Sequence, residues 1–114
     1  MKFFHNDAPC AQSLKYYADI GINLFNPGIQ NTLTELCRIS GGQLTILGNL
    51  PPRDVLAQGT PDDVRAAIRR LLAENSDHSH LILSCAGGMP PGTSTANIEA
   101  FLDEAAAAIA NPAR

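Results

Sequence analysis

The strongest constraint on the fold is a pattern that repeats four times along the chain. A short apolar run ends in small or polar residues and is followed by a segment with helical spacing, and the runs cover residues 2–5, 22–25, 44–47 and 80–84. This alternation is typical of proteins built from βα units. Because the runs are continuously apolar, the strands should be buried on both faces, as in a parallel sheet between helices or a barrel wall. We therefore predict an α/β fold with (βα)4 architecture and parallel strands.

The predicted helices differ in how clearly they begin. The third has the clearest start, because Thr60 can cap it, Pro61 suits the first helical position, and the acidic pair at 62–63 complements the positive end of the helix dipole. Its apolar stripe lies within 64–72, and we expect its arginines to form a solvated outer face: Arg65, Arg69 and Arg70. Apolar spacing predicts the other helices around residues 14–18, 33–37 and 98–109, and Asn111-Pro112 should end the last of them.

The length of the chain limits how much of a larger fold it can form. Its 114 residues suit a single domain, which we take as 1–114. A (β/α)8 TIM barrel typically takes about 250 residues, so four units are close to half of one. Half a barrel leaves two strand edges whose unpaired N–H and C=O groups recruit another chain. We expect either a partner that supplies the other half-barrel or self-association.

Composition excludes several classes of protein. The net charge is −3 and the basic residues are scattered, which argues against nucleic-acid binding. No run approaches the roughly 18 to 20 apolar residues that cross a bilayer, and the N-terminus lacks a signal-peptide pattern, so we expect a cytoplasmic protein with no membrane partner. The three widely spaced cysteines should be free thiols, and those on the helix faces, Cys10 and Cys37, should be packing residues.

Candidate functional residues follow the predicted strands. In barrels and open α/β sheets, ligands bind beyond the carboxyl ends of the strands. The polar groups at that end come from all four units: His5, Asn6, Asp7, Asn26, Asn49, Ser84 and Cys85. The segment Asp77–His80 resembles a metal motif, but it precedes the fourth strand and is expected to be a solvated connector.

A zinc site is one interpretation of these residues. His5 and Asp7 are two apart, so in an extended strand their side chains project to the same side. A His, an Asp and a Cys are acceptable zinc ligands, and three protein ligands with an open position is the catalytic pattern, so we predict His5, Asp7 and Cys85 as metal ligands. In the alternative interpretation, His5 and Asp7 bond the loop backbone and Cys85 is a small buried hydrophobe.

Five ordered motifs, which together span nearly the whole chain, resemble the C-terminal portion of the uroporphyrinogen decarboxylase superfamily. They are Phe4-His5-Asn6-Asp7, Asp19-Ile20-Gly21-Ile22-Asn23, Leu47-Gly48-Asn49-Leu50-Pro51-Pro52, Gly59-Thr60-Pro61-Asp62-Asp63-Val64, and the segment 83–93 followed by Asn97-Ile98-Glu99-Ala100-Phe101. The resemblance implies a (β/α)8 barrel that is either a decarboxylase of porphyrin biosynthesis or a cobalamin-dependent methyltransferase. It also implies that the missing half-barrel is the N-terminal one.

The two branches of the superfamily differ in their residues. The decarboxylases need no cofactor and carry a substrate-binding His in a Gly-His-Gly turn after the last strand, where this chain has Ala86-Gly87-Gly88. The methyltransferases bind zinc through His-x-Cys and a Cys in the final turn. His5 matches the first ligand, Asp7 stands in place of the first Cys, and Gly87 stands in place of the second, with Cys85 two residues earlier.

The resemblance therefore favours a methyltransferase-like domain, with zinc and a corrinoid as cofactors and a corrinoid protein as a further partner. In that reading, zinc at His5, Asp7 and Cys85 activates a thiol for methyl transfer, and we expect Asn6, Asn26, Asn49 and Gly87 to contact the substrate. No catalytic residue is assigned. The third hypothesis is a non-catalytic subunit of a split barrel, and we expect the isolated chain to be inactive because half of the loops around a barrel site are absent.

Overall fold

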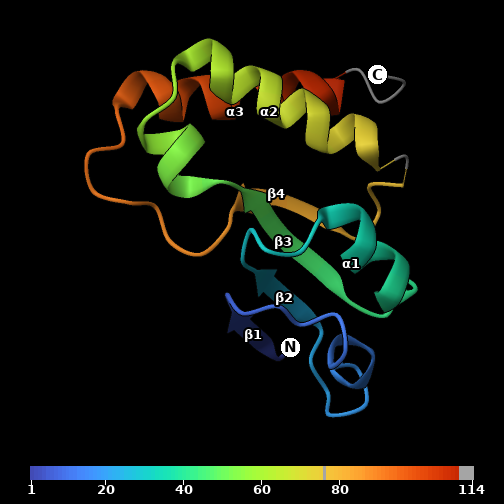
Figure 1. Cartoon of the computed structure of the whole chain (residues 1–114). Coiled ribbons are helices and arrows are strands. Elements are labelled where there is room, and N and C mark those ends of the chain that lie inside the picture. The colour runs from blue at the N-terminus through green and yellow to red at the C-terminus, as the bar shows by residue number, and fades with distance from the viewer. Residues whose placement is uncertain (76, 111–114) are drawn as a thin grey trace.

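Four parallel strands form the centre of the structure, a computed structural model that describes residues 1–75 and 77–110, without the side chain of residue 109. The strands lie in the order β1-β2-β3-β4 and are β1 (Phe3–Asn6), β2 (Leu24–Pro27), β3 (Thr45–Leu50) and β4 (Leu81–Cys85). The helices are α1 (Leu33–Ser40), α2 (Pro61–Glu74) and α3 (Thr95–Ala110) (Figure 1). The predicted α/β fold with a parallel sheet is confirmed, and four βα units are consistent with half of a TIM barrel.

Each strand extends further toward the C-terminus than predicted. β2 continues through Asn26, which pairs with His5 of β1, and β3 continues through Asn49, which pairs with Ser84 of β4. The prediction ended these two strands at Phe25 and Leu47. The ladder continues because both amide side chains are buried with hydrogen-bond partners inside the chain, which removes most of the cost of burying them.

The helix predicted around 14–18 is wrong in extent. The structure has only a 3₁₀ helix at Leu14–Tyr16, and the segment is held by short-range turns such as Ser13 N to Cys10 O at 3.0 Å. Ser13 also donates its hydroxyl to Cys10 O, a bond by which Ser competes with regular helix formation. Leu14 and Tyr17 are nevertheless buried, so the apolar spacing identified the core residues correctly.

α2 begins at the expected signal, whereas the predicted end of α3 at Asn111-Pro112 lies outside the described residues. Thr60 accepts a bond from Asp63 N, and the Asp63 carboxylate accepts one from Thr60 N, which completes a capping box before Pro61. α1 is capped by Thr32 and ends at Gly41, whose φ of 58° is left-handed. A π-helical turn at Pro52–Ala57, which was not predicted, connects β3 to α2.

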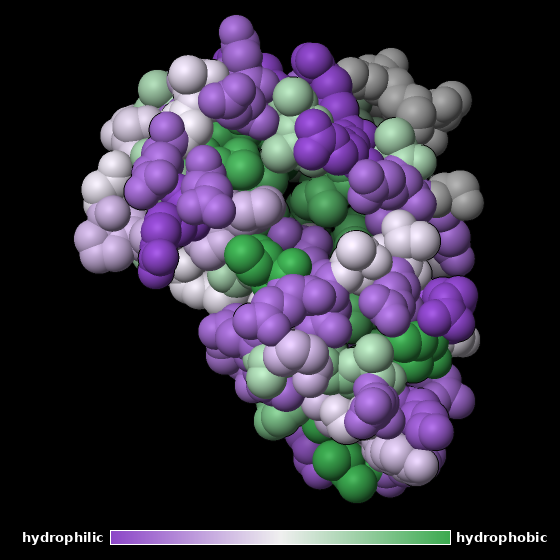
Figure 2. Space-filling view, in the orientation of Figure 1, coloured by the Kyte–Doolittle hydropathy of each residue, from purple (hydrophilic) through white to green (hydrophobic). Residues whose placement is uncertain are grey.

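The core lies between the helices and one face of the sheet. One cluster joins Phe25 and Ile46 to Leu33 and Leu36 of α1, and a second joins residues of β3, α2 and α3, including Leu50, Val64, Ile68 and Ala100. On the face that is visible in Figure 2, polar and apolar side chains are interspersed. No helix in the described part of the chain is long and apolar enough to cross a membrane.

The opposite face of the sheet has no helix packed on it within the described residues. Ile46 belongs to the core, so its neighbour Leu47 points the other way, and Leu47 pairs with Ile82. Ile82 is 47% exposed and Phe3 is 52% exposed. This face corresponds to the interior of a barrel that the chain only half forms.

The arginines of α2 lie on an outer face as predicted, and one of them also pairs with α3. Arg69 and Arg70 are exposed and Arg65 is half-buried. Arg69 also donates two bonds to Glu104, with Nε to Oε1 at 2.7 Å and Nη2 to Oε2 at 3.2 Å. The bonds from Glu104 raise the pKa of Arg69. The sequence did not show this pair because its members are 35 residues apart and meet only when the two helices pack.

Candidate functional site at the strand ends

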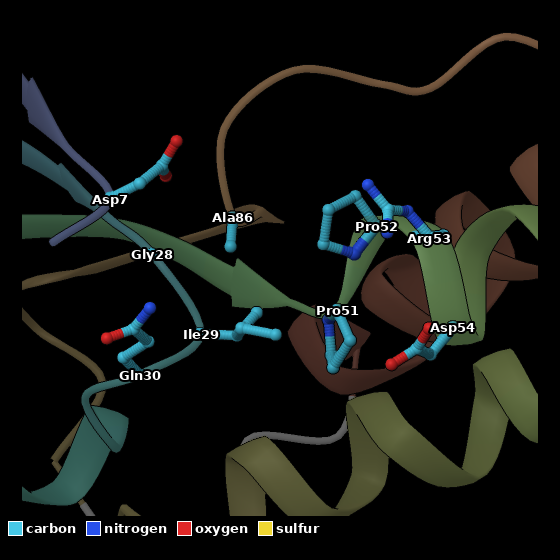
Figure 3. Close-up of a pocket in the computed structure, with 9 residues that line it drawn as sticks. All are labelled: Asp7, Gly28, Ile29, Gln30, Pro51, Pro52, Arg53, Asp54 and Ala86. Carbon is cyan, nitrogen blue, oxygen red and sulfur yellow. The ribbon is translucent and has the colours of Figure 1, made fainter.

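The loops after all four strands line one pocket at the carboxyl edge of the sheet. It has a volume of about 280 Å³ and takes Asp7 from the end of β1, 28–30 from the loop after β2, 51–54 from the turn after β3, and Ala86 from the end of β4. Figure 3 shows Asp7 on one side of this pocket and Arg53 on the other, with Ile29 between them. This convergence is what parallel strands impose, because their carboxyl ends meet at one edge.

His5 and Asp7 form a pair beside this pocket. His5 Nε2 lies 3.2 Å from Asp7 Oδ2, and the two side chains are 40% and 66% exposed. β1 positions His5, and Asp7 follows directly after the last residue of this strand. The prediction that these two side chains lie together is therefore met, and both remain accessible to a ligand.

Asn26 lies under the imidazole and is almost fully buried. Its Oδ1 is 2.8 Å from His5 Nδ1 and accepts a bond from Gly87 N at 3.1 Å. Its Nδ2 donates to Leu47 O and to Cys85 O. One amide thus connects β1, β2, β3 and the loop after β4.

The other predicted substrate-binding amides also have partners within the chain. Asn6 Oδ1 accepts a bond from Ala8 N at 3.0 Å, and the buried Asn49 donates to Asn31 O at 2.8 Å and to Gly28 O at 3.4 Å. These bonds fix the loops after β1 and β2. That Asn6, Asn26, Asn49 and Gly87 contact a substrate stays a prediction.

Cys85 is buried in the core cluster with Leu50 and Val64, and Gly87, two residues later, passes beside the His5–Asp7 pair. The Cys85 thiol donates to Gly87 O at 3.3 Å. A Cβ at Gly87 would lie 3.6 Å from both Asp7 Oδ1 and His5 Cε1, so the backbone of this residue passes close to the pair. Among the described residues, no three His, Cys, Asp or Glu side chains are grouped so that they could hold a metal ion. The predicted zinc site at His5, Asp7 and Cys85 stays a prediction.

A glycine after β2 allows the loops of β1 and β2 to touch. A Cβ at Gly28 would lie 2.5 Å from Asp7 O and 2.8 Å from Asp7 Cα, which real side chains do not tolerate. Gly28 also donates its backbone N–H to Asn6 O at 3.2 Å. The position of Asp7 therefore requires a glycine 21 residues later in the sequence, at residue 28.

Arg53 is a site residue that sequence reasoning missed. Its side chain lines the pocket at the first turn after β3, and within the described residues its guanidinium has no ion-pair partner. The strand-end rule that selected Asn49 would have selected Arg53 as well.

The remaining sequence candidates are structural. Cys10 is buried, and Cys37 is half-buried against the same core cluster. Desolvation by burial raises the pKa of both thiols, as expected for packing residues, with smaller contributions from Glu35 on Cys10 and Asp77 on Cys37. In the described chain all three cysteines are free.

The connector before β4 also matches its prediction. The Asp77 carboxylate accepts bonds from the hydroxyl of Ser79 at 2.6 Å and from its backbone N–H at 3.0 Å, and these bonds lower the pKa of Asp77. Both residues are exposed at the end of the sheet opposite the pocket.

Comparisons with known proteins agree with this fold. None of the curated protein sequences compared with the chain matches it. Among solved structures, a methyltransferase from Methanosarcina mazei superposes with a TM-score of 0.77 at 18% sequence identity, and the match covers 90% of this chain and 29% of that one. The chain thus spans less than a third of the length of that structure, and the likeness shows a shared fold. The family model for uroporphyrinogen decarboxylase (URO-D) matches residues 1–108, and the chain therefore belongs to the uroporphyrinogen decarboxylase family.

Proposed function

We propose that this chain is the C-terminal half of a (β/α)8 barrel that transfers a methyl group between a corrinoid and a thiol, assisted by zinc. The observation that carries the proposal is the His5–Asp7 pair, an imidazole nitrogen and a carboxylate oxygen 3.2 Å apart beside the pocket. Both are groups that zinc accepts as ligands.

The donor chemistry of the pair fits a zinc ion as two of its ligands. His5 Nδ1 is bonded to an amide oxygen, which orients the ring and leaves Nε2 as the ligating atom, the usual arrangement around zinc-bound histidines. Cys85 is the proposed third ligand. In the structure its thiol donates to Gly87 O. A thiol that keeps this bond leaves the third zinc ligand to be supplied by the remainder of the barrel.

Each part of the site has a distinct task in this proposal. Bound zinc supplies Lewis acidity that keeps a substrate thiol in its thiolate form, the nucleophile for a methyl group. Asp7 and His5 place their donor atoms at the carboxyl edge of the sheet, and the pocket between Asp7 and Arg53 admits the substrate. A corrinoid protein, as methyl donor or acceptor, approaches from the same edge.

The decarboxylase reading is less well supported by the residues of this chain. In the resemblance that the sequence shows, decarboxylases place a histidine in the turn after the last strand. Here that turn is Ala86-Gly87-Gly88, and it passes beside His5 and Asp7 with no ionisable side chain.

Zinc binding by the chain tests the proposal directly. We expect the purified chain to bind about one zinc ion in competition with a chromophoric chelator, and His5→Ala and Asp7→Ala to weaken binding at least tenfold. Cys85→Ala tests whether the third ligand is the Cys85 thiol or comes from the remainder of the barrel. Zinc binding should weaken in this variant only when the thiol is a ligand. His80→Ala is the matched control, because His80 is an exposed histidine at the opposite end of the sheet.

Methyl transfer is then followed by the absorbance of methylcobalamin with 2-mercaptoethanol as acceptor. We expect no turnover by the chain alone, and turnover when the N-terminal half of a full-length family member is co-expressed with it. A chain that binds no zinc, or whose zinc binding is unchanged in His5→Ala, would remove the zinc-assisted mechanism. Turnover by the chain alone would refute the half-barrel reading.

A further inference from the structure

We infer that Asn26 is a positioning residue that fixes the tautomer of His5 and ties the loop after β4 to the imidazole, so that Nε2 presents its lone pair at the site. The inference deepens the proposed function and rests on it for its chemical purpose. Its structural basis, however, is independent of zinc. It assigns Asn26 a role through His5 in place of the predicted contact with substrate.

The orientation of the Asn26 amide is set by its surroundings. Leu47 O and Cys85 O are both acceptors, so the group facing them must be the NH₂ of Asn26. Gly87 N is a donor, so the group facing it must be the carbonyl oxygen. Three backbone groups therefore specify the same orientation, and a flipped amide would place like groups against each other at every contact.

The amide orientation in turn specifies the His5 tautomer. His5 Nδ1 lies 2.8 Å from Asn26 Oδ1 and 3.1 Å from the backbone oxygen of Asn26. Both are acceptors, so Nδ1 must carry the proton. In the neutral ring, Nε2 then holds a lone pair, and this is the nitrogen that lies 3.2 Å from Asp7 Oδ2. Nε2 and the Asp7 carboxylate then both present lone pairs to the same region, an arrangement that suits a bound cation.

Asn26 has no capacity left for a substrate. Its Oδ1 accepts two hydrogen bonds and its Nδ2 donates two, and the residue is only 5% exposed. Because the same oxygen bonds both Gly87 N and His5 Nδ1, displacement of the loop after β4 and rotation of the ring are coupled. Asn26 thus holds the loop backbone beside the His5–Asp7 pair.

Long-range proton–nitrogen NMR spectra of the ¹⁵N-labelled, metal-free chain at alkaline pH test the inference. In the wild type we expect the Nδ1–H tautomer as the major form of His5. Asn26→Ala should shift the tautomer ratio by about 2- to 10-fold toward Nε2–H, the range expected for loss of one hydrogen bond while the backbone acceptor remains. Amide exchange at Gly87 should accelerate in the same variant.

Two further variants separate positioning from stability. Asn49→Ala is the matched control, because it removes another buried strand-end amide, 7% exposed, that does not contact His5. It should lose stability without changing the tautomer. Asn26→Asp keeps the oxygen that accepts from His5 and Gly87 and loses both donated bonds, so it should preserve the tautomer and serves as the informative variant if Asn26→Ala does not fold.

The outcomes are distinct from those of the zinc experiment. A wild-type His5 in the Nε2–H form, a tautomer unchanged in Asn26→Ala, or an equal shift in Asn49→Ala would each overturn the inference. An Nδ1–H tautomer that depends on Asn26 in a chain that binds no zinc would sustain it while refuting the metal-assisted function.

Discussion

Gly28→Ala is the substitution whose effect the structure defines most sharply. The new Cβ would lie 2.5 Å from Asp7 O, 2.8 Å from Asp7 Cα and 3.0 Å from Asp7 C. Ordinary contact begins at 3.4 Å, so the nearest atom is about 0.9 Å too close. All three atoms belong to the backbone of one residue, and a rotamer change cannot relieve the clash. The loop after β1 must move away from the loop after β2.

The expected cost is that of overpacking a buried site, about 1–3 kcal/mol of the free energy of unfolding. A central value of about 2 kcal/mol corresponds to a fall in Tm of about 8 °C for a chain of this length. The same displacement carries Asp7 away from His5, and zinc binding should weaken in parallel with stability. Urea unfolding followed by circular dichroism measures the first effect, and chelator competition measures the second.

Gly88→Ala is the matched control. A Cβ at Gly88 meets no atom within 4 Å, and this glycine is exposed. The alanine should be neutral or slightly stabilising, by up to about 1 kcal/mol, because it restricts the unfolded chain. If Gly28→Ala unfolds within 0.5 kcal/mol of the Gly88→Ala variant, about the scatter of neutral surface substitutions, the close approach to Asp7 does not constrain the site and the reasoning is wrong.

Three further predictions concern the cap, the uncovered face and the connector. Thr60→Ala removes the side-chain half of the capping box and should lower the free energy of unfolding by about 1 kcal/mol in a urea titration, and an unchanged midpoint would contradict the role of the cap. Ile82→Lys places a charge on the uncovered face of the sheet, so light scattering should find the wild type self-associated and the variant monomeric, whereas a monomeric wild type would count against self-association. Ser79→Ala removes the hydroxyl hydrogen bond that helps to lower the pKa of Asp77 and keeps the backbone one. An NMR titration should therefore find the pKa of Asp77 raised toward its ordinary value. Because the folded-state pKa of Asp77 is lowered, its contribution to stability is complete above the ordinary pKa of an aspartate and is lost as pH falls through the lowered value. In the variant this contribution should be smaller, and its loss should be complete at higher pH.

The sequence determined those features whose causes are local. The capping box at Thr60 forms within four residues, and the four apolar runs predicted the number, order and parallel direction of the strands because a βα alternation permits few other arrangements. The adjacency of His5 and Asp7 also followed from the sequence, since side chains two apart in an extended segment lie on one side.

Only the tertiary structure decided features whose partners are far apart in the chain. The spacing at 14–18 predicted which residues are buried, but not that the segment would form turns instead of a helix. Arg69 was paired with Glu104 by the packing of α2 on α3, and Asn26 was assigned to His5 and Gly87 by contacts across 21 and 61 residues. A buried amide and a solvated one have the same sequence signature. Their difference arises from the desolvation of a polar group, which must find its partners wherever the folded chain brings them.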